Sequence, residues 1–163
     1  MVPKTMNIGT VGSPQKAAVA LAHGCHHVID YRRQDFVAAT LALTAGEGVS
    51  VVYDAVGKDV FLPSLQCLRP RGMAINYGTA SGDVEAFDLQ LLHAKSLSVC
   101  RPTLRTFVAD PAELRQAAQA FFDVALAGEV RLEVHHRYPL ADVQRAHHEL
   151  ESRITTGVPV LLP

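Results

Sequence analysis

Residues 7–30 read NIGTVGSPQKAAVALAHGCHHVID, and they place a strand, a tight turn, a helix and a second strand one after another. The first strand ends before Ser13, a favoured helix N-cap, and Pro14 suits the first helical position. Gly24 ends the helix, and residues 27–30 form the next strand. The helix face that is expected to be buried carries Ala17, Ala20 and Leu21. This order predicts a strand–helix–strand unit of a parallel sheet.

The same alternation continues along the chain. Later strands are expected over residues 49–53, 73–77 and 97–100, and helices over residues 34–45, 59–68 and 88–92. The strand at residues 49–53 is apolar almost throughout, which is typical of a strand buried on both faces. Alternating strands and helices predict an α/β fold with a doubly wound parallel sheet that helices cover on both faces.

The alternation lapses over residues 101–110, and the chain then becomes mainly helical. Residues 110–113 have the form of a capping box that opens a helix, and Gly128 ends it. A second helix is expected after residues 138–140, followed by a final strand over residues 158–162. The side chains expected to face inward are Leu114, Ala118, Phe121 and Ala125 on the first helix and Val143, Ala146, Leu150 and Ile154 on the second.

The composition is that of an ordinary globular domain. Hydrophobic residues make up 48% and charged residues 19% of the 163 positions, which excludes a disordered chain. The net charge of -1 disfavours binding to nucleic acid or to anionic lipid, and no run is apolar enough for a membrane span. Three widely spaced cysteines, Cys25, Cys67 and Cys100, suit reduced thiols, so a cytoplasmic protein is expected.

Metal and hydrolase sites are not expected. The eight histidines include adjacent pairs at residues 26–27, 135–136 and 147–148, but neighbouring residues on a strand or helix point in different directions and do not form a ready chelate. The Gly-x-Ser-x-Gly pattern of a nucleophile elbow is absent. Asp54 and Asp88 are interpreted as turn or capping residues rather than as a catalytic carboxylate pair.

Doubly wound sheets bind ligands beyond the carboxyl ends of their strands, where loops and helix N-termini offer N–H groups to phosphates. The loops at that edge are expected at residues 12–16, 30–33, 54–58 and 77–82. The segment at residues 9–12, GTVG, lacks both the G-x-G-x-x-G and the Walker spacing, so it does not predict a pyrophosphate loop.

The end of the first strand favours a ribose 2′-phosphate. A fold that binds NAD usually places a carboxylate on the ribose hydroxyls, whereas a 2′-phosphate needs that carboxylate to be absent and cations to be near. Here Ser13 and Lys16 follow the first strand, and residues 31–33, Tyr-Arg-Arg, follow the second. From spacing alone, the alternative is a capped surface helix with solvated Lys and Arg side chains.

Six motifs in order carry a family resemblance. They are IGTVGSPQKA at 8–17, VIDYR at 28–32, VVYDAVG at 51–57, NYGTASG at 76–82, RPTL at 101–104 and AHHELESR at 146–153. Together they resemble the C-terminal portion of the quinone oxidoreductase (zeta-crystallin-like) branch of the medium-chain dehydrogenase/reductase superfamily. The resemblance covers nearly the whole chain.

The resemblance implies an NADPH-dependent reductase that transfers hydride to a quinone or another enone, without a catalytic zinc. Around the adenosine ribose and its 2′-phosphate it places Gly12, Ser13, Lys16 and Tyr31. Beside the nicotinamide end it places Tyr77 and Gly78, and it assigns a cofactor contact to Arg153. No residue of this chain is expected to be catalytic or to bind a metal.

The sequence departs from the resembled family at its N-terminal end, because it begins at what corresponds to the second strand of the nucleotide domain. Residues 1–103 then form a partial dinucleotide-binding domain that lacks the first strand and the glycine-rich loop. Residues 104–163 form a C-terminal helical segment and a strand that return, in the family, toward a GroES-like catalytic domain. The strands at residues 7–11 and 49–53 are expected to lose their shared neighbour.

The edge strand at Leu97–Cys100 is the expected contact of a homodimer, since the resembled family continues its sheet across a two-fold axis at this edge. The alternative for this strand is a protected edge in a monomer. The alternative to an oxidoreductase is a non-catalytic, truncated dimerisation or assembly module that docks on another chain. The absence of the first strand motivates this alternative.

Overall fold

A computed structural model describes residues 5–130, 133–152 and 155–163, and it divides into two units, Met1–Glu113 and Leu114–Pro163. The division that was expected after residue 103 falls inside unit 1. Parallel pairing occurs in every sheet of the described residues, so the expected α/β fold with parallel strands is confirmed.

The first strand–helix–strand unit forms as predicted. Strands β1 (Ile8–Val11) and β2 (His27–Asp30) pair in parallel, and α1 (Pro14–Ala22) contacts both of them. Ser13 caps α1, and its hydroxyl accepts a hydrogen bond from the Lys16 N–H at 3.3 Å. The chain then enters α2 (Phe36–Leu43), which packs against β2.

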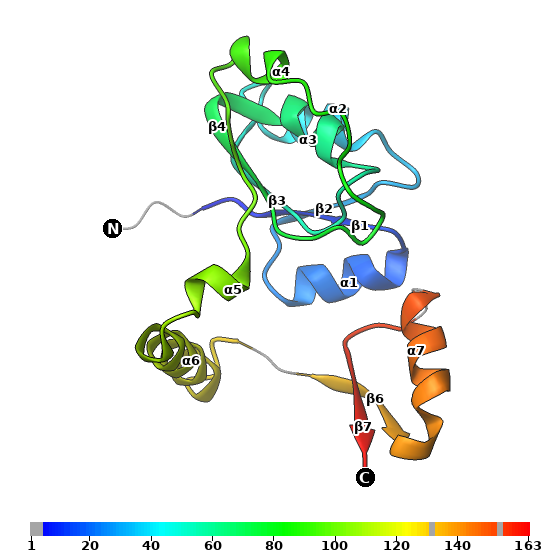
Figure 1. The fold of residues 1–163 in the computed structure, drawn as a ribbon. Helices are drawn as coiled ribbons and strands as arrows, with labels where there is room; N and C mark the ends of the chain where they lie inside the picture. The colour runs from blue at the N-terminus through cyan, green and yellow to red at the C-terminus, as the bar shows by residue number, and fades with distance from the viewer. Residues whose placement is uncertain (1–4, 131–132, 153–154) are drawn as a thin grey trace. The chain divides into compact units, whose positions relative to one another are not determined.

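A second parallel sheet contains β3 (Val49–Asp54), β4 (Leu68–Asn76) and β5 (Ser98–Cys100), in that order. The helices of this part are α3 (Phe61–Gln66) and the short α4 (Gln90–His93), and Figure 1 shows α3 alongside the sheet. The core between α3 and the sheet contains Phe61, Leu65, Leu68, Ala74 and Leu97.

The opposite face of this sheet carries exposed side chains within unit 1, so the expected cover of helices on both faces is not seen over β3 in the described residues. The register places Val51 beside Met73 and Tyr53 beside Ile75, so these side chains share one face. Tyr53 is 71% exposed and Val51 39% exposed. The prediction that residues 49–53 are fully buried was therefore wrong, because α3 packs on the other face of the strand.

Strands β1 and β3 belong to different sheets in the described residues. Within the described ranges, β1 pairs only with β2, and β3 pairs only with β4. Each of these two strands therefore keeps one edge on which its backbone N–H and C=O groups have no strand partner in this part of the chain.

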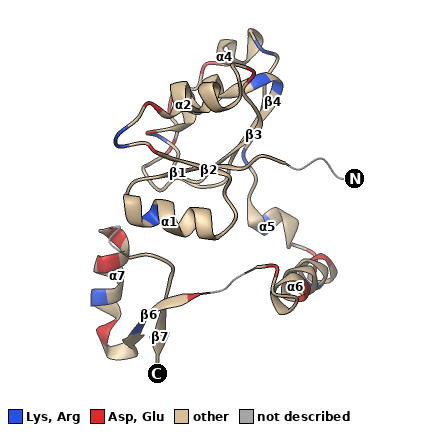
Figure 2. Ribbon diagram, turned by 180° about the vertical axis from the view of Figure 1, so that it is seen from behind, with Lys and Arg blue, Asp and Glu red and all other residues tan. Residues whose placement is uncertain are grey.

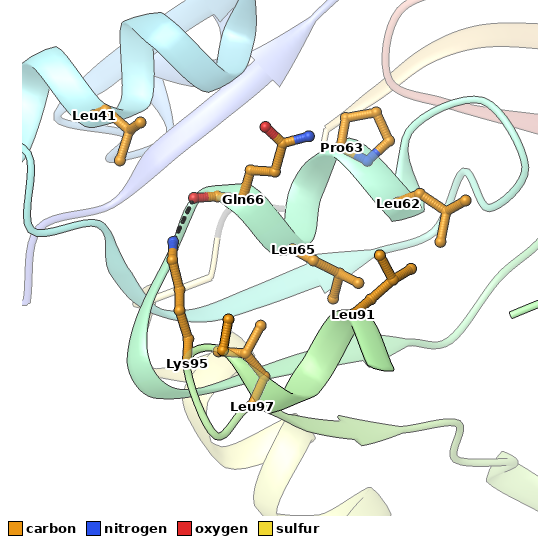
Figure 3. Close-up of a pocket in the computed structure, with 9 residues that line it drawn as sticks. Leu41, Leu62, Pro63, Leu65, Gln66, Leu91, Lys95 and Leu97 are labelled. Carbon is orange, nitrogen blue, oxygen red and sulfur yellow. Dashed lines mark hydrogen bonds between the residues drawn. The ribbon is translucent and has the colours of Figure 1, made fainter. Parts of the chain in front are cut away.

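The amino-terminal end of β4 is organised by Lys95. Strand β4 begins at Leu68, earlier than the expected residue 73. The preceding helix, α3, ends at Gln66 rather than at the expected residue 68. The Lys95 ammonium donates a hydrogen bond to the Gln66 carbonyl oxygen at 3.0 Å (Figure 3) and another to the Leu68 carbonyl oxygen at 2.7 Å. It thereby occupies the carbonyl groups left unpaired where α3 ends.

A cavity of about 540 Å³ adjoins this lysine. Leucine side chains from α2, α3 and α4 contribute to its lining, as Figure 3 shows for Leu41, Leu62 and Leu91. It lies beside the start of β4, whereas the loops singled out in the sequence follow the ends of the strands.

The helical segment after β5 contains α5 (Leu104–Phe107) and α6 (Pro111–Leu126), which begins as predicted after Asp110. The Asp110 carboxylate accepts a hydrogen bond from the Ala112 N–H at 2.7 Å. No residue of α6 is buried, and Leu114 and Phe121 are each 47% exposed. Of the four side chains expected to face inward, Leu114 and Phe121 are therefore exposed, whereas Ala118 and Ala125 are partly buried.

Unit 2 holds one strand that the sequence did not predict. Strand β6 (Val134–Pro139) pairs in parallel with β7 (Val158–Leu162), and a short 3-10 turn (Leu140–Asp142) leads into α7 (Val143–Glu151). Ala146 of α7 is buried as expected, Leu150 is 49% exposed, and Ile154 lies outside the described residues.

Tyr138 joins β6 to α7. Its hydroxyl donates to the Glu149 carboxylate at 2.6 Å, and the Arg145 guanidinium lies 5.3 Å from its ring centre. The hydrogen bond to Glu149 raises the pKa of Tyr138, because the carboxylate stabilises the protonated phenol.

None of the helices in the described ranges has the length and apolar character that crossing a bilayer requires.

Candidate functional site

The loop after β1 brings together three of the residues that the sequence singled out. A Cβ atom on Gly12 would lie 2.7 Å from the Tyr31 hydroxyl oxygen, so the tyrosine side chain lies directly over this glycine. Ser13 follows as the cap of α1. Tyr31 is 37% exposed, which leaves its ring accessible beside the start of α1. A side chain at position 12 would displace the Tyr31 ring from this place.

The start of α1 is electropositive. Lys16 lies in its first turn and is the only charged side chain of the helix (Figure 2). The N-terminus of a helix carries a partial positive charge, and its first N–H groups can bind an anion. Arg32, which follows Tyr31, adds a second cation, with its Nε 3.3 Å from a Cβ built on Gly12. Lys16 and Arg32 therefore place positive charge in the first turn of α1 and beside Gly12, which favours an anionic group near this loop.

The loops after β3 and β4 are joined into one structure, which we call the double loop and define as residues 54–60 and 77–83. The Ser81 N–H donates to the Val56 carbonyl at 2.8 Å, and the Lys58 N–H donates to the Gly82 carbonyl at 3.0 Å. The Ser81 hydroxyl also donates to the Val56 carbonyl at 2.8 Å. The two loops therefore act as one rigid surface at the carboxyl edge of the sheet.

Two glycines allow the two halves of the double loop to approach this closely. Gly57 has a φ of +87°, and a Cβ on it would lie 2.5 Å from the Gly82 carbonyl oxygen. A Cβ on Gly78 would lie 2.7 Å from the Ala55 carbonyl oxygen. Gly78 was singled out in the sequence, and the neighbouring Tyr77 side chain is 58% exposed.

A buried carboxylate, that of Asp54, accepts hydrogen bonds from the backbone and side chains that shape the double loop. Asp54 ends β3 and is only 3% exposed. It accepts hydrogen bonds from the Val56 N–H at 2.8 Å, the Gly57 N–H at 3.2 Å and the Asn76 side-chain amide at 2.9 Å. Its role in shaping a turn was predicted, and the Gln90 N–H to Asp88 bond at 2.8 Å confirms the same interpretation for Asp88.

Sequence reasoning missed two residues of this edge. Asn76 is buried and Arg101 follows β5, and the Arg101 guanidinium donates to the Asn76 side-chain oxygen. Both residues lie in motifs that were quoted for the family resemblance, NYGTASG and RPTL, which was the available signal.

The remaining expected site residue, Arg153, lies outside the described residues. Among the residues with a described placement, no group of three or more His, Cys, Asp or Glu side chains could hold a metal ion. Burial raises the pKa of the Cys67 thiol, which lies beside Thr40 and close to Lys95, so the neutral thiol is favoured there.

Comparisons with known proteins agree with the resemblance. Residues 7–123 match the zinc-binding dehydrogenase family. A quinone oxidoreductase of Pseudomonas aeruginosa is 45% identical over 157 residues, which are 96% of this chain and 48% of that protein. The structure of Escherichia coli quinone oxidoreductase complexed with NADPH matches with a TM-score of 0.92 and 42% identity, over 97% of this chain and 49% of that one.

A quinone oxidoreductase structure from Pseudomonas syringae gives the same TM-score of 0.92 at 40% identity, over 97% of this chain and 49% of that one. The chain therefore spans about half the length of the relatives that it matches.

Proposed function

The chain belongs to the zinc-binding dehydrogenase family of the medium-chain dehydrogenase/reductases, and on this basis we propose that it is the NADPH-binding part of a quinone oxidoreductase. The proposed reaction is hydride transfer from NADPH to a quinone or another enone. The observation that carries the proposal is the loop after β1, where Tyr31 covers Gly12 and Lys16 lies in the first turn of α1. The relative solved with NADPH supports the choice of cofactor.

The residues after β1 and β2 would hold the adenosine end of the cofactor. The positive end of the α1 dipole and the Lys16 ammonium offer positive charge to a 2′-phosphate. Ser13 accepts a hydrogen bond from the Lys16 N–H and so fixes where the helix begins. Tyr31 supplies an accessible ring beside Gly12 for the adenosine.

The double loop would hold the nicotinamide end. Its exposed Tyr77 can cover one side of a bound ring, and Gly78 lets the loop after β4 lie directly against Ala55. NADPH supplies the hydride when it is bound, and the protein supplies its position. Arg153 is retained in the proposal as a further cofactor contact.

The same proposal covers the metal requirement, the location and the oligomeric state of the protein. The reaction would proceed without zinc, in the cytoplasm. The edge strand at Leu97–Cys100 would join two copies of the chain, since β5 pairs only with β4 in the part of the chain that the structure describes and Val99 and Cys100 are exposed. A sedimentation or light-scattering measurement that gives the mass of a single chain at all concentrations would contradict the dimer.

Substituting Lys16 with Glu tests the cofactor assignment. K16E is expected to raise the Kd for NADPH by roughly tenfold and to change the Kd for NADH by less than about twofold, because only NADPH carries the 2′-phosphate. Nicotinamide fluorescence during titration measures both constants. The matched control is Arg69→Glu, an exposed cation at the amino-terminal part of β4, which should leave both constants unchanged. Equal weakening of NADPH and NADH by K16E would refute the 2′-phosphate site.

The second candidate function is an assembly module without catalysis. In the described residues, β1 and β3 each have one edge without a strand partner, and Val51, Tyr53 and Met73 are exposed. These features favour the module, because such surfaces pair with other chains. Light scattering would be recorded with and without a separately expressed N-terminal half of a relative. A stable oligomer that binds no nucleotide and ignores that half would favour the module over the oxidoreductase.

A further inference from the structure

One continuous chain of side chains links the ends of the three strands β3, β4 and β5. Asp54 ends β3, Asn76 ends β4 in direct register with it, and Arg101 immediately follows β5. Asp54 and Asn76 are each 3% exposed. The link therefore runs from a buried carboxylate through a buried amide to a guanidinium at the surface.

Asn76 uses both ends of its amide in this link. Its Nδ2 donates to the Asp54 carboxylate at 2.9 Å and to the Gly78 carbonyl at 3.0 Å. Its Oδ1 accepts from Arg101, whose guanidinium also lies 3.6 Å from the carboxylate of Asp83. Arg101 therefore connects the amide beneath Gly78 with Asp83 at the far end of the same loop.

Arg101 completes the hydrogen bonding of Asn76, which is almost fully buried. An amide has one acceptor oxygen and two donor hydrogens, and at Asn76 both donors are directed to Asp54 and Gly78. Without Arg101 the buried Oδ1 would lack its donor, and the side chain would gain by turning or moving toward solvent. Either movement would release the Gly78 carbonyl.

We propose that Arg101 is a positioning residue that sets the conformation of the double loop through Asn76, and thereby determines how tightly the nicotinamide end of the cofactor is held. The inference rests on the proposed function. Arg101 acts here through Asn76 and Asp83, and the surface that it organises is the one formed by Tyr77 and Gly78.

The test compares two nucleotides on the full chain and on R101M. Adenosine 2′,5′-bisphosphate carries only the adenosine end, whereas NADPH also carries the nicotinamide. R101M is expected to raise the Kd for NADPH by about tenfold and to leave that for the bisphosphate within about twofold. R101K, which keeps one charged donor, should recover part of the loss. Arg105→Met, an exposed arginine on α5, is the matched control.

Amide hydrogen exchange provides a measurement that needs no ligand. The Gly57 and Ser81 N–H groups, which donate to Asp54 and Val56, should exchange several-fold faster in R101M than in the unmodified chain. Unchanged exchange at both amides overturns the inference. So does an R101M protein that binds NADPH and the bisphosphate as the unmodified chain does.

The two proposals fail in different ways. If the unmodified chain binds neither nucleotide, the proposed function fails and the exchange rates alone decide the role of Arg101. If R101M weakens both nucleotides equally, Arg101 supports the whole unit rather than the double loop, and the inference is wrong while the cofactor site stands.

Discussion

Substituting Gly57 with Ala is expected to abolish measurable NADPH binding and to lower the free energy of unfolding by roughly 3 kcal/mol. Two costs add at this position. A φ of +87° is strained for any residue with a Cβ, and that Cβ would lie 2.5 Å from the Gly82 carbonyl oxygen. The obstructing atom is backbone, so the loop after β4 must move. Urea denaturation and an NADPH titration measure the two effects.

Gly24 offers a matched control for this variant. Its φ is +96°, yet no atom lies within 4 Å of a Cβ built on it. Gly24→Ala should therefore show only the conformational cost of about 1 kcal/mol and should leave NADPH binding unchanged. If Gly57→Ala lowers the free energy of unfolding no more than Gly24→Ala does, the double loop can move to accommodate the added Cβ. Its close backbone contacts then do not determine the shape of the site.

The sequence predicts best where the structural signal is local. The β1, α1 and β2 unit follows from a cap, a proline and a terminal glycine that lie within one short run, and the structure has each of them in place. The turn role of Asp54 was likewise predictable, because its first acceptor bonds go to N–H groups two and three residues later.

Long-range pairing explains what the sequence could not predict. Strand β6 reads VHHRYP, in which only Val134 and Tyr138 suggest a strand, and it is stabilised by parallel pairing with β7 across the intervening helix. The apolar run of β3 predicts burial on two faces, but whether a second layer covers Tyr53 depends on elements elsewhere. Neither fact is encoded in the local pattern.

The same reason accounts for the two missed residues of the site. Asn76 and Arg101 meet only because β3, β4 and β5 pair in one particular register. A shift of one residue would turn Asn76 to the opposite face of the sheet, away from Asp54. A motif can indicate that such residues matter to the family, but the contacts that they make are determined by the register of the sheet.

Asp54→Ala is the second variant with a large expected effect, a loss of about 3 to 5 kcal/mol of unfolding free energy. The substitution leaves the Val56 and Gly57 N–H groups and the Asn76 amide without their acceptor, in a place that is almost fully buried. Because the carboxylate accepts three donors at once, the double loop should lose its conformation before the rest of unit 1 unfolds. Urea denaturation, followed by circular dichroism, measures the loss.

Asp30 is the matched control, since it ends β2 as Asp54 ends β3. It is half-buried, and its carboxylate accepts a hydrogen bond from the exposed Arg32 N–H at 3.1 Å. Asp30→Ala should therefore cost about 1 kcal/mol or less, because water can replace the lost acceptor. Both aspartates end a strand but only Asp54 is almost fully buried, so comparing the two variants isolates the effect of burial on the loss of stability. A loss at Asp54 no greater than that at Asp30 would mean that the backbone bonds between Val56, Ser81 and Gly82 hold the double loop without the carboxylate.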